Sequence, residues 1–335
     1  MTLGSTGTTV TLGLDAQNLL GTAAVSAGYA FNANERTGRV FGGLTYQGAY
    51  PMFDVSASSE QRRTQLPIDR ALPIDSLRSD SWRQNDLNLG LRLPLNLTRS
   101  KYLTSLEFGG QFNLIQSRGY QLPDRYLNQV GDGTLQAITA TVAFSRFHRQ
   151  APRDLLPRWG QLFNLYVRST PFGGDLRGNL TALSGGVLVP GLARHHGLLL
   201  RGSIQTQGRD DSYVFASPVL FPRGYAYVSF NRLWTGLVDY RLPLLYPDLS
   251  LGRFFFIQRV KANVFADYGQ GYRQVRNNRG QWQGVTRTYQ SVGLDLSMDF
   301  NFMRLRQRLE LGVRGVYLVN ENRFEFQPLV VDIGF

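Results

Sequence analysis

Apolar and polar residues alternate along much of the chain with a period of two. In the segment 291–302, SVGLDLSMDFNF, every second position is apolar and the positions between are small or polar. The segment 86–95, DLNLGLRLPL, repeats the pattern with leucine at every second position. Because successive side chains of a β-strand point to opposite faces, each segment is predicted to be a strand with one apolar and one polar face.

Fifteen such segments can be placed along the chain, and most have about ten residues or more. A tilted strand that crosses a membrane needs about 9–11 residues, whereas strands of soluble proteins average about 5–6. The pattern predicts one all-β domain over 1–335, an antiparallel transmembrane β-barrel. A large soluble β-sandwich, which also alternates, is the alternative. The predicted segments are 7–15, 21–32, 37–48, 51–58, 84–96, 100–115, 134–147, 159–169, 177–189, 196–207, 229–243, 258–269, 286–302, 307–319 and 324–335.

The alternation also assigns a face to each side chain of the barrel wall. The positions predicted to face lipid include Leu89, Leu294, Leu296 and Ile333. The acidic positions predicted to face a polar interior are Asp295, Asp299 and Asp332. Such alternation of apolar and polar faces is typical of outer-membrane barrels.

The connections between segments differ in length by parity. Those after the fourth, sixth, tenth and twelfth segments are long, while most after odd-numbered segments are short turns such as GAYP and NLTRS. Outer-membrane barrels have long loops outside and short turns in the periplasm, and their strand number is even. We therefore expect about 16 strands, 15 visible and one upstream of residue 1, in the C-terminal part of a longer protein. Fourteen or sixteen strands within this chain are the alternatives.

Composition removes several classes of function. The chain has no cysteine and three histidines, so no metal site is expected, and no motif of a nucleotide, cofactor or catalytic site is present. We expect no cofactor and no enzymatic activity. The net charge of +12 comes from arginines spread through every segment, which favours contacts with a lumen or with membrane lipid over a nucleic-acid partner. No apolar run approaches the roughly 18 residues of a spanning helix.

One connection, FPRGYAY at 221–227, carries candidate binding chemistry. Arg223 lies in a predicted loop, and the two strands that follow place Asp239 and Asp267 at predicted inward positions. If the loop folds into the lumen, the guanidinium can form charge-assisted hydrogen bonds with both carboxylates. The alternative is an ordinary outer turn, which accounts for Pro222 and Gly224 but not for Arg223.

These residues resemble the C-terminal half of the BamA/TamA/two-partner-secretion superfamily of outer-membrane assembly barrels. The resemblance rests on RGY in a loop, DYRLPL and VFADYG in the next two strands, and a terminal strand ending in Phe335. It is specific over 221–335 and only architectural before that. It implies a sixteen-strand barrel in which Arg223, Gly224 and Tyr225 form a loop motif inside the lumen, with Asp239 and Asp267 as its acidic partners.

The resemblance also implies a location and partners. A member of this superfamily lies in the outer membrane of a Gram-negative bacterium, surrounded by outer-membrane lipid. It helps to insert or translocate nascent outer-membrane or secreted proteins and has a periplasmic domain before the barrel. Two other functions stay open: a passive porin-like pore, and an anchor for a periplasmic or surface domain.

The terminal segment FQPLVVDIGF, 326–335, resembles the signal by which outer-membrane barrels are recognised for insertion. A closing edge strand is the simpler interpretation, and both can hold. Pro328 cannot donate a hydrogen bond to a neighbouring strand, which suits a weakly paired seam. The residues assigned to the signal are Phe326, Leu329, Val331, Ile333 and Phe335.

Overall fold

The structure is a computed structural model, and it describes residues 2–4, 7–33, 35–67, 77–119, 132–151, 153–208, 212–252, 254–276, 282–302 and 308–333. These residues form strands, turns and irregular segments. None of them belongs to a helix long and apolar enough to cross a membrane. The strands are β1 (Thr2–Gly4), β2 (Gly7–Gln17), β3 (Ala23–Asn32), β4 (Thr37–Tyr46), β5 (Met52–Pro67), β6 (Leu77–Asn96), β7 (Tyr102–Arg118), β8 (Gly133–His148), β9 (Gly160–Ser169), β10 (Asn179–Pro190), β11 (Gly197–Gln207), β12 (Arg232–Leu245), β13 (Leu249–Leu251), β14 (Phe255–Arg276), β15 (Trp282–Phe302), β16 (Arg308–Leu318) and β17 (Arg323–Ile333).

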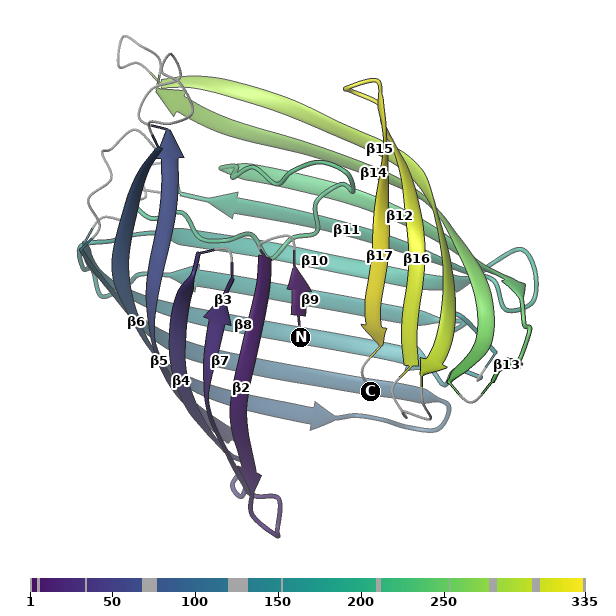
Figure 1. Cartoon of the computed structure of the whole chain (residues 1–335), viewed down its shortest axis with the longest axis horizontal. Coiled ribbons are helices and arrows are strands. Elements are labelled where there is room, and N and C mark those ends of the chain that lie inside the picture. The colour runs from purple at the N-terminus through teal and green to yellow at the C-terminus, as the bar shows by residue number, and fades with distance from the viewer. Residues whose placement is uncertain are drawn as a thin grey trace.

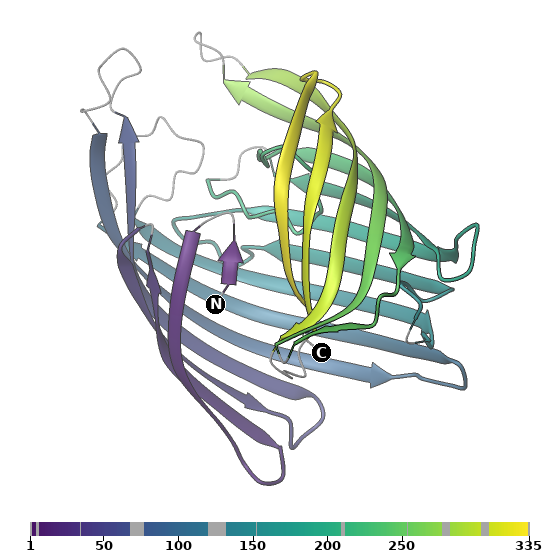
Figure 2. The same cartoon turned by 45° about the vertical axis from the view of Figure 1, so that its right-hand side comes forward.

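The strands form one antiparallel meander from β2 to β17, in which each long strand pairs with the next long strand along the chain. The sheet curls round on itself until β2 and β17 stand at its two free edges (Figures 1 and 2). Of the seventeen described strands, β1 and β13 are short, and the other fifteen have ten or more residues each. Each overlaps one of the fifteen predicted segments, so the predicted all-β antiparallel barrel is confirmed.

The two edges of the sheet differ from the rest of the wall. No ladder between β2 and β17 is found among the described residues, whereas β1 pairs Thr2–Gly4 with the start of β2. β1 is far shorter than a membrane-crossing strand, and it lies on the side of β2 that faces β17 (Figures 1 and 2). A full strand upstream of residue 1 stays a prediction.

Two hairpins are longer than predicted. The segments 51–58 and 84–96 were expected to flank a long loop, but β5 continues to Pro67 and β6 begins at Leu77. β14 and β15 likewise continue past the predicted ends at 269 and 286. The added residues are mostly polar and their few apolar residues do not alternate regularly, so hydrophobic alternation does not mark them, while the backbone ladder needs no apolar face. The 208–231 connection alone remains both long and largely described.

The predicted faces are correct on β6 and β15. The outward side chains Leu89, Leu294 and Leu296 are 44%, 42% and 47% exposed. The inward side chains Asp295 and Asp299 are buried, at 7% and 0%. The outer wall is therefore apolar where the inner wall carries charge, as a membrane barrel requires.

The faces of β17 are described as far as Leu329. Val313, which is 53% exposed on the outer wall, pairs with Pro328, so Pro328 belongs to the outer face. Gly312 pairs with Leu329 on one side and with the buried Ser297 on the other, so Leu329 belongs to the inner face. The side chains of Asp332 and Ile333 lie outside the described residues, and their predicted faces stay predictions.

Two residues assigned to a terminal signal do not share a face. Phe326 is 75% exposed on the outer face, with its ring tilted against that of Phe324 at a ring-centroid distance of 4.9 Å. Leu329 lies on the opposite face by the register of β17. The side chains of Val331, Ile333 and Phe335 lie outside the described residues.

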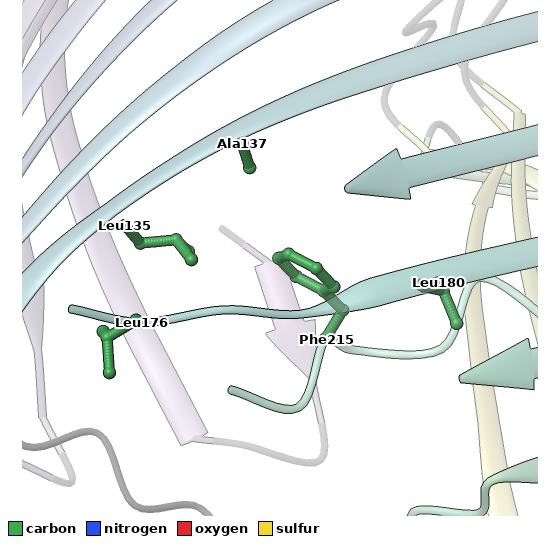
Figure 3. Close-up of a cluster of buried hydrophobic side chains, with 5 residues drawn as sticks. All are labelled: Leu135, Ala137, Leu176, Leu180 and Phe215. Carbon is green, nitrogen blue, oxygen red and sulfur yellow. The ribbon is translucent and has the colours of Figure 1, made fainter. Parts of the chain in front are cut away.

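The interior of the barrel is filled in part by the connection 208–231. Its Phe215, 2% exposed, packs with residues of β8, of β10 and of the connection before β10 in a buried cluster (Figure 3). The other members of this cluster are Leu135, Ala137, Leu176 and Leu180. A second cluster joins Phe221, Tyr225 and Phe230 of the connection to Tyr289 of β15. These two contacts hold the connection inside the barrel and position the site described next.

Candidate functional site: a lumen loop bound by two aspartates

Arg223 lies at the centre of the lumen loop, which we define as residues 208–231. Its Nε and Nη2 donate to the two carboxylate oxygens of Asp267 at 2.7 and 2.6 Å. Its Nη1 donates to Asp239 Oδ1 at 2.7 Å, and its backbone N–H donates to Asp267 Oδ2 at 2.9 Å. One arginine therefore joins the loop to β12 and β14 through a bidentate pair and a second ion pair, the strongest class of hydrogen bond in proteins.

The site is almost sealed from solvent. The side chains of Asp239 and Asp267 are 1% and 0% exposed, and that of Arg223 is 13% exposed. Asp239 has two further partners, Arg201 Nη2 at 2.7 Å and Asn263 Nδ2 at 2.9 Å. Asp267 has only the side chain and backbone of Arg223 as hydrogen-bond donors among the described residues. Loss of Arg223 would thus affect Asp267 far more than Asp239.

The charge on Arg223 is stabilised by its surroundings. Burial opposes the charged form, but the hydrogen bonds that Arg223 donates to Asp267 and the negative charges of Asp267 and Asp239 outweigh it and hold the pKa of Arg223 above its ordinary value. The guanidinium also lies over the ring of Phe265, 3.8 Å from its centroid, in a cation–π contact. Phe265 is 2% exposed and was not predicted from the sequence.

Position 224 accepts only glycine. Its φ of +87° lies in the left-handed region that favours glycine. A Cβ atom there would come within 2.6 Å of Leu318 Cδ2 and 3.1 Å of Val316 Cγ1 on β16. The turn of the loop therefore lies directly against the wall, and both the backbone angle and the space require glycine.

Tyr225 and Pro222 complete the contact between loop and wall. The Tyr225 hydroxyl donates to the Gln290 carbonyl at 2.8 Å, and its ring lies 5.1 Å from that of Tyr289. Pro222 is almost fully buried and packs over Gly269 of β14, where a Cβ would approach Pro222 Cγ to 2.8 Å. The glycine of VFADYG thus makes room for the loop. The loop residues therefore contact β12, β14, β15 and β16.

The charged network extends beyond the predicted residues. Asn263 joins Asp239 to Asp295 by a hydrogen bond of 3.2 Å, and Asp295 binds Arg314 through both oxygens, at 2.7 and 3.1 Å. The sequence contained a signal for this network, because its members occupy alternate inward positions of consecutive strands. It could not show which acid binds which base, since that depends on the stagger between strands.

His195 and His196 bond to other side chains of the protein. His195 Nδ1 lies 2.6 Å from Asp154 Oδ1, and His196 Nδ1 lies 2.9 Å from the Tyr240 hydroxyl. The ring of His195 therefore contacts the connection between β8 and β9, and that of His196 contacts β12. No group of three or more His, Asp or Glu side chains that could hold a metal ion occurs among the described residues.

Two solved structures have a similar fold, one of BamA and one of CdiB. BamA from Haemophilus ducreyi lacking POTRA domains 1–3 aligns with a TM-score of 0.56 and 12% identity, covering 98% of this chain and 68% of that chain. CdiB from Escherichia coli aligns with a TM-score of 0.55 and 14% identity, covering 98% of this chain and 59% of its own. No family model matches the sequence, and a comparison with curated proteins finds no match.

The similarity confirms the fold that the resemblance implied. At 12–14% identity it shows the barrel fold alone. The chain spans about two thirds of the length of this BamA chain and somewhat less of CdiB, at 68% and 59%. Activity and partners therefore have to be argued from the residues of this chain.

Proposed function

We propose that this protein is an outer-membrane barrel of the protein assembly or translocation type, and that its lumen loop is held in place by Arg223. The observation that carries the proposal is the set of three ion-pair hydrogen bonds from Arg223 to Asp267 and Asp239 within a barrel of the BamA and CdiB fold. The location is the outer membrane of a Gram-negative bacterium, and the partners are lipid and nascent outer-membrane or secreted proteins.

The distribution of contacts supports an assembly role over a passive pore. The lumen loop binds β12, β14, β15 and β16, so this part of the wall is held by ion pairs and by buried aromatic side chains. The edges at β2 and β17 have no ladder between them in the described residues. With the predicted upstream strand beside β2, the barrel would close between that strand and β17, away from the contacts of the lumen loop. A wall that is held on one side would open at that closing seam, where backbone groups can pair with a strand of another chain.

The alternative functions make different predictions for conductance. A porin-like pore needs a continuous aqueous path, whereas the lumen loop places Phe215, Phe221 and Phe230 inside the barrel. We therefore expect the purified protein to conduct weakly in a planar bilayer. A membrane anchor would also conduct weakly, but it would not change the folding of other proteins.

A reconstituted folding assay tests the proposal. The protein is incorporated in lipid vesicles, and the insertion of a second, denatured outer-membrane barrel is followed by the shift in its gel mobility on folding. Faster insertion than in vesicles without the protein supports assembly activity. Insertion at the same rate, together with a stable open-channel conductance, would favour the porin-like pore.

A further inference from the structure

A polar groove interrupts the apolar outer wall at the rim that carries the lumen loop. It has a volume of about 640 Å³ and lies across the ends of β10, β11, β12 and β14. We call it the rim groove, and define it by Thr181, Thr206, Arg232, Tyr272 and Gln274. Register pairs Thr181 with Thr206, Thr206 with Arg232 and Arg232 with Tyr272, so these four residues form one row across the wall.

The wall below the rim groove is apolar and aromatic. Two residues further along their strands, Ile204 is 58% exposed and Trp234 is 45% exposed on the same outer face. The ring of Trp234 lies 4.8 Å from that of Tyr268. Aromatic side chains of this kind collect at the boundary between acyl chains and headgroups. The rim groove is therefore at the level of the lipid headgroups.

The rim groove has one uncompensated charge. Arg232 is exposed, and its guanidinium forms no hydrogen bond or ion pair with any described residue. None of the residues that line the groove is acidic. A guanidinium on a lipid-facing wall is costly without an anion beside it. The charge therefore calls for an anionic partner from outside the chain.

A buried polar atom at the groove also lacks a partner. The Oε1 of Gln274, a residue that lines the groove, has no hydrogen-bond partner among the described residues, although its amide nitrogen donates to the Tyr272 hydroxyl at 3.1 Å. Buried polar atoms without a protein partner are rare and usually bind water or a ligand. This atom belongs to the same groove as the Arg232 side chain.

We propose that the rim groove binds the phosphorylated headgroup of a membrane lipid in the leaflet at this rim. Arg232 donates to the phosphate oxygens, and the hydroxyls of Thr181 and Thr206 donate to the phosphate or to a sugar attached to it. The acyl chains then follow Ile204 and Trp234 along the wall. This inference rests on the membrane location proposed above, and it concerns the lipid partner instead of the protein client.

Lipid retention by the detergent-purified barrel tests the inference. Native mass spectrometry compares a phosphorylated glycolipid with the same glycolipid after removal of its phosphate groups, for the unmutated protein and for Arg232→Gln. We expect the unmutated barrel to retain the phosphorylated form, and Arg232→Gln to weaken that retention about tenfold. The dephosphorylated glycolipid should be retained weakly by both proteins.

Arg83→Gln is the matched control. Arg83 is also exposed on the outer wall, on β6, but its Nε already donates to Ser59 Oγ at 3.1 Å. Its loss should leave retention unchanged. Equal loss in both variants would show nonspecific attraction, and equal retention by Arg232→Gln and the unmutated protein would also overturn the inference. Release of the lipid by an equal concentration of inorganic phosphate would show a free-phosphate site instead.

The outcome is independent of the assembly function. Retention is measured in detergent and needs no client protein, so a barrel that fails to accelerate client insertion can still bind the lipid. Conversely, Arg232→Gln should leave client insertion per folded barrel unchanged, because Arg232 does not contact the lumen loop's ion pairs. The two proposals can therefore fail separately.

Discussion

Removal of the Arg223 side chain is the perturbation whose consequences the structure defines best. Arg223→Ala deletes three hydrogen bonds to buried carboxylates and the cation–π contact with Phe265. Breaking a buried ion pair by removing one partner costs about 3–5 kcal/mol. Asp239 keeps Arg201 and Asn263, and Asp267 keeps only the backbone N–H of residue 223. Because Asp239 stays paired while the buried Asp267 keeps one donor, we expect a cost within this range, at least about 3 kcal/mol.

This free energy acts on the attachment of the loop, so a local assay is appropriate. Chymotrypsin cleaves after aromatic residues such as Tyr225 and Tyr227, and it does not need the arginine that is removed. If cleavage follows opening of the loop, a cost of about 3 kcal/mol raises the cleavage rate roughly a hundredfold. Arg201→Ala, which removes a guanidinium bound to Asp239 but not to the loop, is the control. We expect its effect to be several-fold smaller.

A double-mutant cycle with Asp267→Asn isolates the pair. Asp267→Asn alone leaves Arg223 bound to Asp239, so its effect should be smaller than that of Arg223→Ala. In the double variant no buried carboxylate at position 267 is left unpaired, and we expect a coupling of about 2 kcal/mol. Additivity of the two single effects within about 0.5 kcal/mol would refute the reasoning.

Three further perturbations follow from the same contacts. Gly224→Ala should release the loop and raise chymotrypsin cleavage, because it combines a φ of +87° with a Cβ contact at 2.6 Å; Gly252→Ala, at φ +63° with nothing within 4 Å, should have a smaller effect on stability. Arg223→Lys should give cleavage between that of Arg223→Ala and the unmutated protein, since lysine keeps the charge but not the bidentate geometry. Leu294→Arg should destabilise the inserted barrel by about 2–4 kcal/mol and so lower its folding yield in vesicles. Gln111→Arg, at an exposed position of the inner wall, should not change the yield, and equal yields for the two variants would contradict the assigned faces.

The sequence predicted the wall well because a membrane barrel repeats one simple constraint. Each strand must place apolar side chains outward, so segments such as 291–302 show both the strand and its faces. The constraint ends where the wall leaves the membrane, and the polar extensions of β5, β6, β14 and β15 were missed there. It is also ambiguous where both parities are apolar, as at 329–331.

The site was predictable in its charged residues and not in its packing. An arginine in a loop and two inward aspartates are visible as residue types, and the resemblance connected them. Phe265 beneath the guanidinium and Gly269 beneath Pro222 could not be selected, because their roles depend on the register between strands and on how deeply the loop enters. Arg201 was missed for the same reason, since cross-strand register brings it to Asp239.

The central claim is that a lumen loop held by Arg223 serves protein assembly, and one measurement tests it directly. The rate at which vesicles containing the barrel promote insertion of a denatured outer-membrane client is compared for the unmutated protein, Arg223→Ala and Arg201→Ala, at equal amounts of folded barrel. We predict acceleration by the unmutated protein, most of it lost in Arg223→Ala and most of it kept in Arg201→Ala. The same insertion rate for the unmutated protein and Arg223→Ala would contradict the claim.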